Sequence, residues 1–97
     1  MYFSIMKIIW SNNARLNNLK NLDYLFNNWN LDVVLNYEEK LINVENSLIS
    51  NPYLGQFDKK LNLYKILVVP QIYLFYELDQ NQIKIINIWN NHKKPYW

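Results

Sequence analysis

The chain has 97 residues, of which 51% are hydrophobic and 16% aromatic, and it carries a formal net charge of +2. This composition argues against disorder and predicts one compact domain over residues 1–97. The absence of cysteine excludes disulfides and thiolate chemistry, a single histidine argues against a metal site, and no apolar stretch approaches the roughly 20 residues that span a bilayer.

The first residues do not have the features of a secretory signal. They lack a basic flank and a long apolar region, so we expect a cytoplasmic protein without membrane contact. Met6 directly precedes the first predicted strand. Residues 1–5 are therefore either part of the domain or an extension before a natural start at Met6, and the sequence leaves both open.

The first third of the chain predicts a strand followed by a helix. The short apolar run from Ile5 to Trp10 is rich in β-branched residues, and Ser11 after it is a good N-cap. Between residues 12 and 29 apolar residues recur every three or four positions, which predicts a helix with one buried stripe. The stripe consists of Leu16, Leu19, Leu22, Phe26 and Trp29. We expect Asn30 to end this helix in the left-handed conformation.

A second amphipathic helix follows at once. Asp32 is its expected N-cap, and its apolar positions repeat at three and four residues: Val34, Tyr37, Leu41, Val44 and Leu48. A connection of two or three residues forces the two helices into an antiparallel hairpin. Asn51-Pro52 ends the second helix, because a residue before proline is pushed out of the helical region, and Gly55 follows in the loop.

Three β-type runs complete the chain, at residues 63–69, 72–78 and 83–89. The connections between them are short, which predicts antiparallel pairing. The last run is apolar on both faces, as in a central strand, although one helical layer covers only one face. The order of elements predicts a two-layer α+β fold, in which a helical hairpin packs on one antiparallel sheet and the first strand joins beside the last.

Positive charge is concentrated in the second half of the chain. Residues 1–52 carry four Lys/Arg and five Asp/Glu, whereas residues 53–97 carry six lysines and three acids. The lysines of the second half are the available material for a surface that binds an anionic partner such as RNA: Lys59, Lys60, Lys65, Lys84, Lys93 and Lys94. An ordinary solvated surface explains the same charges.

Six segments match, in order, the motifs of a known family. They are Lys7–Ala14 (Lys-Ile-Ile-Trp-Ser-Asn-Asn-Ala), Tyr24–Asn30, Asn51–Gly55 (Asn-Pro-Tyr-Leu-Gly), Tyr64–Val68, Phe75–Tyr76 and Ile88–Pro95. With these segments the chain resembles the RelE/ParE family, the toxins of bacterial type II toxin–antitoxin systems, over residues 6–95.

The resemblance implies both a fold and a role. The fold is β-α-α-β-β-β with the first strand beside the last. The role is that of a toxin held in a hetero-oligomer by a cognate antitoxin. RelE-like members cut mRNA in the ribosomal A site without a metal, whereas ParE-like members inhibit DNA gyrase. The expected partners are therefore an antitoxin and either the ribosome with its mRNA or gyrase, without a cofactor or metal.

Metal-independent RNA cleavage requires a base, an acid and cations around the phosphate. His92 is the chain's only histidine, the side-chain type that titrates near neutral pH. RelE-like nucleases use basic residues on the sheet and groups near the C-terminus, so the resemblance carries catalytic roles to Lys65, His92, Lys93 and Tyr96. The remaining candidates, for binding RNA phosphates, are Lys59, Lys60 and Lys94.

Other features favour a protein that does not cleave RNA. The family usually has arginine where His92 stands, and the only arginine of this chain, Arg15, lies on the first predicted helix. Glu77 adds a negative charge where a basic residue is frequent. The alternatives are that His92 and its lysines form a solvated tail, that Lys59 and Lys60 are a solvated loop pair, and that the chain is an inactive binding module.

Aromatic residues are expected to pack mainly in the core. Trp10, Trp29, Trp89, Tyr64, Tyr73 and Tyr76 lie within apolar runs, where packing is favoured over stacking on bases. Tyr96 and Trp97, at the end of the chain, can either stack on a base or dock on the sheet.

Overall fold

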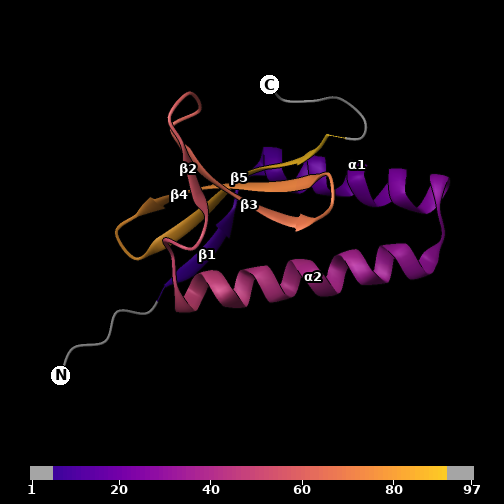
Figure 1. Ribbon diagram of the computed structural model, residues 1–97, viewed down its shortest axis with the longest axis horizontal. Helices are drawn as coiled ribbons and strands as arrows, with labels where there is room; N and C mark the ends of the chain where they lie inside the picture. Colours follow the sequence, from indigo (N-terminus) through magenta and orange to yellow (C-terminus); the bar gives the residue numbers. More distant parts are fainter. Residues whose placement is uncertain (1–5, 92–97) are drawn as a thin grey trace.

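The computed structural model describes residues 6–91, in which a helical hairpin packs on a five-stranded sheet (Figure 1). The elements are β1 (Lys7–Trp10), α1 (Asn12–Asn28), α2 (Leu31–Ser50), β2 (Gln56–Asp58), β3 (Leu63–Val69), β4 (Ile72–Asp79) and β5 (Gln82–Asn90). The strand order is β1-β5-β4-β3-β2, and β1 is parallel to β5 whereas all other pairs are antiparallel. The predicted two-layer fold with the first strand beside the last is thus confirmed.

The predicted strands agree closely with the structure, with one addition. β3 has the expected bounds, and β4 and β5 are slightly longer than expected. The short strand β2 was not predicted, because three residues after a Pro-Gly loop carry no alternating pattern. It pairs with β3 through Gln56 opposite Lys65 and Asp58 opposite Leu63. Ile5, the first residue of the predicted first strand, lies outside the described residues.

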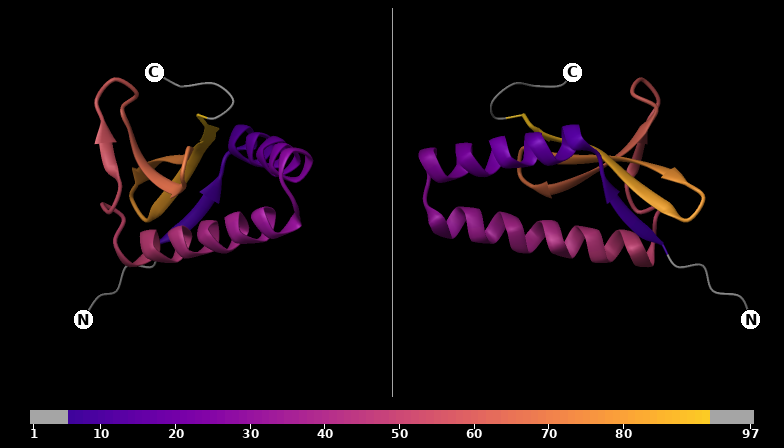
Figure 2. Two further views of the ribbon diagram at one scale, coloured as in Figure 1. Left: turned by 45° about the vertical axis from the view of Figure 1, so that its right-hand side comes forward. Right: turned by 180° about the vertical axis from the view of Figure 1, so that it is seen from behind.

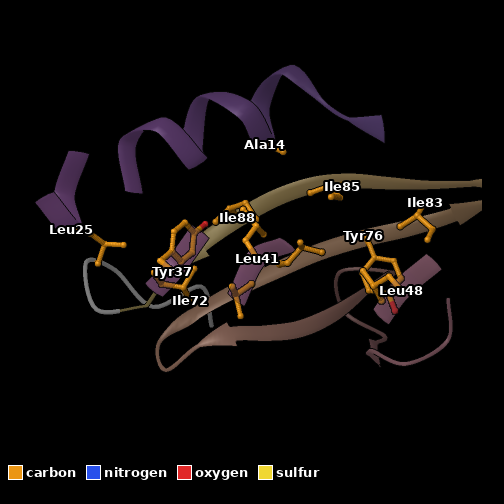
Figure 3. Packing of buried hydrophobic residues seen from close by; sticks show 12 residues of the cluster. Ala14, Leu25, Tyr37, Leu41, Leu48, Ile72, Tyr76, Ile83, Ile85 and Ile88 are labelled. Atoms are coloured by element: carbon orange, nitrogen blue, oxygen red, sulfur yellow. The ribbon is translucent and has the colours of Figure 1, made fainter. Parts of the chain in front are cut away.

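The core lies between the two helices and the sheet (Figure 3). The apolar stripe predicted for α2 is confirmed, because Tyr37, Leu41 and Leu48 are buried and Val34 and Val44 are half-buried. The sheet contributes a matching layer of buried side chains: Ile72, Leu74, Tyr76, Ile83, Ile85 and Ile88. Neither of the two helices in residues 6–91 is long and apolar enough to cross a membrane.

The stripe predicted for α1 is wrong. Leu16, Leu19, Phe26 and Trp29 are 56%, 62%, 57% and 59% exposed, and only Leu22 is half-buried. The buried residues of α1 are instead Ala14, Asn21 and Leu25. The apolar period was recognised correctly, but it marks the face of α1 that points away from the sheet.

Hydrogen bonds of asparagine side chains explain this orientation of α1. Asn17 Nδ2 donates to Asn87 Oδ1 at 2.6 Å, which joins α1 to β5. The Tyr37 hydroxyl donates to Asn18 Oδ1 at 2.6 Å, which joins α2 to α1. Burial, and to a smaller extent the charges of nearby glutamates, raise the pKa of Tyr37 and keep this donor protonated. The side of α1 that faces the protein therefore carries Asn17, Asn18 and Asn21 beside the apolar Ala14 and Leu25, and Leu16, Leu19 and Phe26 face solvent.

The connection between the helices also differs from the prediction. Asn30 has an extended backbone (φ −157°, ψ 178°), and its side chain accepts a hydrogen bond from Val33 N at 3.0 Å. Asn30 is therefore the N-cap of α2, not a left-handed end of α1, and Asp32 lies in the first turn of α2 instead of capping it. Ser11 caps α1 as predicted, since its Oγ accepts from Ala14 N at 3.0 Å. The two helices run antiparallel, as expected (Figure 2).

A bulge explains part of the apolar character of both faces of β5. Tyr76 pairs with Ile85 and Phe75 with Asn87, so Ile86 has no partner on β4. The Ile86 carbonyl instead accepts a hydrogen bond from Ser11 Oγ at 3.0 Å. Because of this extra residue, Ile85 and Ile88 both contribute to the core although they are three positions apart.

We expect Asn21→Leu to stabilise the protein by about 1–2 kcal/mol. Asn21 is 3% exposed, and within residues 6–91 its Nδ2 has no hydrogen-bond acceptor. A buried amide without a partner costs about 1–3 kcal/mol, and leucine removes this cost. Urea unfolding followed by circular dichroism measures the free energy of unfolding.

The matched variants are Asn17→Leu and Asn27→Leu. Asn17→Leu breaks the hydrogen bond to Asn87 and should destabilise the protein by about 1–2 kcal/mol, whereas Asn27 is exposed and its replacement should change stability only by tenths. A loss of stability in Asn21→Leu as large as that in Asn17→Leu would contradict this explanation.

Candidate functional site

The loop between α2 and β2 is anchored by one buried hydroxyl. Tyr76 Oη donates to the Pro52 carbonyl at 2.8 Å and accepts from Gly55 N at 2.9 Å. Burial raises the pKa of Tyr76, so the hydroxyl stays protonated. A Cβ at Gly55 would lie 2.7 Å from Tyr76 Oη and 2.9 Å from the Lys65 carbonyl, so only glycine fits here. The Asn-Pro-x-x-Gly loop thereby places β2 against β3.

The turn from β2 to β3 is organised by Asp58. Its Oδ1 accepts hydrogen bonds from Lys60 N at 2.9 Å and Leu61 N at 3.1 Å. The hydrogen bond from Leu61 lowers the pKa of Asp58 most, and the bond from Lys60 lowers it as well. The positive charge of Lys65 adds to the effect. The other carboxylate oxygen lies 3.7 Å from Lys65 Nζ. One carboxylate thus holds both the turn and the lysine.

Three of the predicted site lysines meet at one hollow beside this turn. Lys59 and Lys60 are exposed on the turn, and half-buried Lys65 reaches the hollow from β3. Asp58 lies among them and is the acidic residue of the lining. The arrangement can bind an anion such as a phosphate if the loose pair between Lys65 and Asp58 opens.

Lys65 also belongs to the face of the sheet that points away from the helices. Side chains alternate along a strand, and the neighbours Tyr64 and Ile66 pack against the core. By the same alternation Tyr73, Phe75 and Trp89 lie on the outer face, where Phe75 is opposite Lys65 and Trp89 opposite Tyr73. Lys65 Nζ is 5.9 Å from the centre of the Tyr73 ring. This outer face combines a cation with aromatic rings, which is a combination that binds single-stranded nucleic acid.

The aromatic predictions have mixed outcomes. Tyr76 is buried in the core, and Tyr64 is half-buried and stacks on it with ring centres 5.2 Å apart. Trp10 is half-buried and donates through Nε1 to Glu45 at 3.3 Å. Trp29, by contrast, is largely exposed, so its predicted packing is wrong. Tyr73 and Trp89 are half-buried on the outer face, not in the core.

The other predicted site residues, His92, Lys93, Lys94 and Tyr96, lie outside the described residues. The described chain ends at Asn91, whose N–H donates to the Gln71 carbonyl at 2.7 Å. Asn91 thus lies next to the β3–β4 turn.

A cavity that the sequence did not reveal lies at the closed end of the helical hairpin, where α1 connects to α2. Its volume is about 310 Å³. The lining comes from both helices and from the β3–β4 turn: Tyr24, Leu25, Trp29, Val33, Asn36, Tyr37, Val69, Pro70, Gln71, Ile72 and Asn90. The lining is mainly apolar, so the cavity suits an apolar side chain and not a reaction. The sequence signal for this cavity was Trp29, an apolar residue at the end of α1 that does not pack in the core.

Comparison with solved structures finds similar architectures, including the following three. A chain of the chromosomal ParDE toxin–antitoxin system from P. aeruginosa has a TM-score of 0.75 and 12% identity, and the match covers 91% of this chain and 98% of that one. The YoeB/ParE toxin from Agrobacterium tumefaciens has a TM-score of 0.59 and 10% identity, with 88% and 98% covered. A chain of the heterotetrameric YoeB-YefM toxin–antitoxin complex from Staphylococcus aureus has a TM-score of 0.58 and 20% identity, with 87% and 94% covered.

The chain has the RelE/ParE toxin fold. Comparison with protein-family models and with curated proteins finds no match. The resemblance read from the sequence motifs is therefore confirmed by the fold, at sequence identities of 10–20%. In this RelE/ParE fold the lysine hollow lies at one end of the sheet, and the apolar cavity lies at the end where β5 finishes.

We expect Tyr76→Phe to destabilise the protein by about 1–3 kcal/mol, because it leaves the Gly55 N–H and the Pro52 carbonyl without their partner. Gly55→Ala should cost at least as much through the clash with Tyr76. Tyr53→Phe is the control, since Tyr53 is 70% exposed and should unfold like the unchanged protein. Equal urea midpoints for Tyr76→Phe and Tyr53→Phe would rule out this anchoring role.

We expect Asp58→Ala to speed amide hydrogen exchange at Lys60 and Leu61, because both N–H groups lose their acceptor. In the unchanged protein this protection is present above the usual carboxyl pKa of 3.8. Because the folded pKa is lowered, it should persist below pH 3.8 and be lost as the pH falls through the lowered value. Asp79→Ala is the matched control, since Asp79 pairs with Lys84 in another turn. NMR exchange rates corrected for intrinsic pH dependence test this, and loss of protection already above pH 3.8 would refute it.

Proposed function

We propose that the protein is the toxin of a type II toxin–antitoxin pair and that a cognate antitoxin neutralises it in a hetero-oligomer. The observation that carries this proposal is the match in fold to the ParDE and YoeB structures, which extends over 87–91% of this chain and 94–98% of theirs. The toxin would act in the cytoplasm, where both candidate targets, the ribosome and gyrase, are found.

Two features of the described residues suit an antitoxin. The cavity at the closed end of the hairpin can accept an apolar side chain of the partner, with Trp29 and Val33 on the helix side and Pro70 on the sheet side. In addition, β1 and β2 are the edge strands of the sheet. An extended partner segment can add to such an edge by backbone hydrogen bonds.

For the activity itself, we propose that the outer face of the sheet binds and cleaves mRNA on the ribosome. Lys65 would neutralise the scissile phosphate, and Tyr73 and Trp89 would stack on the neighbouring bases. Lys59, Lys60 and Lys94 would hold flanking phosphates. Of these residues, Lys59 and Lys60 share the hollow with Lys65.

The proton transfers are assigned to the last residues of the chain. His92 would take the proton of the ribose 2′-hydroxyl as its oxygen attacks phosphorus, and Tyr96 would protonate the departing 5′-oxygen, leaving a cyclic phosphate. Lys93 would stabilise the crowded phosphate beside Lys65.

Gyrase inhibition is the second candidate, and two observations favour it. Lys65 is already paired with Asp58, which lowers the attraction of the outer face for phosphate. Moreover, Arg15 lies on α1 and is exposed, so the sheet in residues 6–91 contains no guanidinium to grip an RNA phosphate. Inhibition of gyrase requires a binding surface but no catalytic groups.

Expression of the chain without its antitoxin should arrest growth. With purified ribosomes and mRNA, primer extension should detect cleavage, and Lys65→Ala and His92→Ala should each lower the rate by about 100-fold or more. Lys84→Ala is the matched control, since Lys84 pairs with Asp79 away from the hollow. Circular dichroism should show that all three variants fold.

A supercoiling assay with purified gyrase separates the candidates. Inhibition of supercoiling without mRNA cleavage identifies gyrase as the target and refutes the catalytic roles of Lys65 and His92. The absence of growth arrest and of both activities would refute the toxin function and leave an inactive binding module.

A further inference from the structure

The outward face of α1 has an apolar stripe that nothing in residues 6–91 covers. We define the α1 stripe as Leu16, Leu19, Leu22 and Phe26, of which all but Leu22 are mostly exposed. Together with Lys20 and Asp23 of α1 and Val34 of α2, the residues of the stripe line a shallow hollow on the surface. Figure 2 shows that α1 lies at the outside of the molecule. Large apolar side chains gathered in this way mark an interaction surface.

Helical geometry places the stripe opposite the buried side of α1. At 100° per residue, Leu19 and Phe26 lie about 20° apart around the helix, whereas buried Asn21 lies about 160° from Leu19 and about 140° from Phe26. A structural role within residues 6–91 is therefore excluded for Leu19 and Phe26. The stripe is not part of the cavity at the closed end of the hairpin, which has a different lining.

The stripe is nearly symmetric about residue 21. Leu16 and Phe26 lie five positions before and after this point, and Leu19 and Leu22 lie two positions before and one after it. Opposite charges are arranged in a similar way on one flank, because Lys20 lies one position before the midpoint and Asp23 two positions after it. In the described part of the chain neither Lys20 nor Asp23 takes part in an ion pair. Both charges are therefore available to another molecule.

This pattern is self-complementary, and we propose that a second copy of the chain packs on the α1 stripe. A two-fold axis through the midpoint sets the two α1 helices antiparallel. Leu16 then meets Phe26 of the second copy, and the two Leu19 side chains meet the two Leu22 side chains near the centre. On one flank Lys20 of each copy meets Asp23 of the other, which gives two equivalent ion pairs. The proposal does not depend on the toxin function, because it uses only the surface of α1.

The charge pairs provide a test that distinguishes this occupant from others. Sedimentation equilibrium of the purified chain should show a monomer–dimer equilibrium. Lys20→Glu and Asp23→Lys should each weaken the dimer by roughly tenfold, because each places like charges in contact twice. The double variant Lys20→Glu/Asp23→Lys should restore dimerisation to near the original level. Lys40→Glu, an exposed change on α2, is the matched control and should have no effect.

An apolar substitution tests the centre of the interface. Leu19→Lys should weaken the dimer by about 100-fold, because both copies lose a buried leucine, while exposed Leu19 contributes little to the fold. Unchanged circular dichroism and an unchanged urea midpoint should confirm that the variant folds. Ile42→Lys, at an exposed apolar position of α2 outside the stripe, should dimerise normally.

Three results would overturn the proposal. The chain could remain monomeric at millimolar concentration, or the double charge variant could fail to restore what the single variants lose. The third is that Leu19→Lys leaves the mass of the isolated chain unchanged but abolishes binding of the antitoxin, which would make the stripe an antitoxin site. Growth arrest by the Leu19→Lys variant is measured in parallel. This measurement separates a loss of toxicity from a loss of the dimer.

Discussion

Side-chain amides attach α1 to the rest of the fold, and this attachment determines which surfaces the molecule exposes. Asn17 bonds to Asn87 on β5, and Asn18 accepts from Tyr37 on α2. Hydrogen bonds depend on direction, whereas apolar contacts do not, so these two bonds fix the rotation of α1 about its axis. The cost is a buried amide at Asn21 and an apolar face turned to solvent. The shape of the hairpin and its free surface have this one origin.

Tyr76 connects the core to the hollow in a similar way. Its ring packs in the core (Figure 3), where it stacks on Tyr64, and its hydroxyl holds the loop through Pro52 and Gly55. The loop in turn sets β2 beside β3, which brings Asp58 next to Lys65. The position of the lysine hollow is therefore determined by a residue that never touches it. For any substitution in this chain of contacts, the free energy of unfolding should be measured before an effect is assigned to the site.

Sequence reasoning succeeded where periodicity and local chemistry act alone. The bounds of β3, the Ser11 cap and the buried stripe of α2 followed from patterns within a few residues. It failed at α1, because the choice between its two faces depends on Asn87, 70 residues away. The hollow was predicted only in part: the lysines were candidates, but the role of Asp58 requires β2, which three residues could not signal. The cavity beside Trp29 is lined by both helices and the β3–β4 turn, so its only signal in the sequence was Trp29 itself.

The pair between Asp58 and Lys65 bears most directly on the choice between the two activities. Its 3.7 Å separation is longer than a good charge-assisted hydrogen bond, so an RNA phosphate can compete with the carboxylate for the lysine. When Lys65 leaves Asp58, the carboxylate still accepts hydrogen bonds from Lys60 N and Leu61 N. Binding of phosphate would therefore leave the turn intact and make Lys65 available only when an anion is present. If the chain instead inhibits gyrase, Lys65 and Asp58 would stay paired. The outer face of the sheet would then be a nearly neutral aromatic surface.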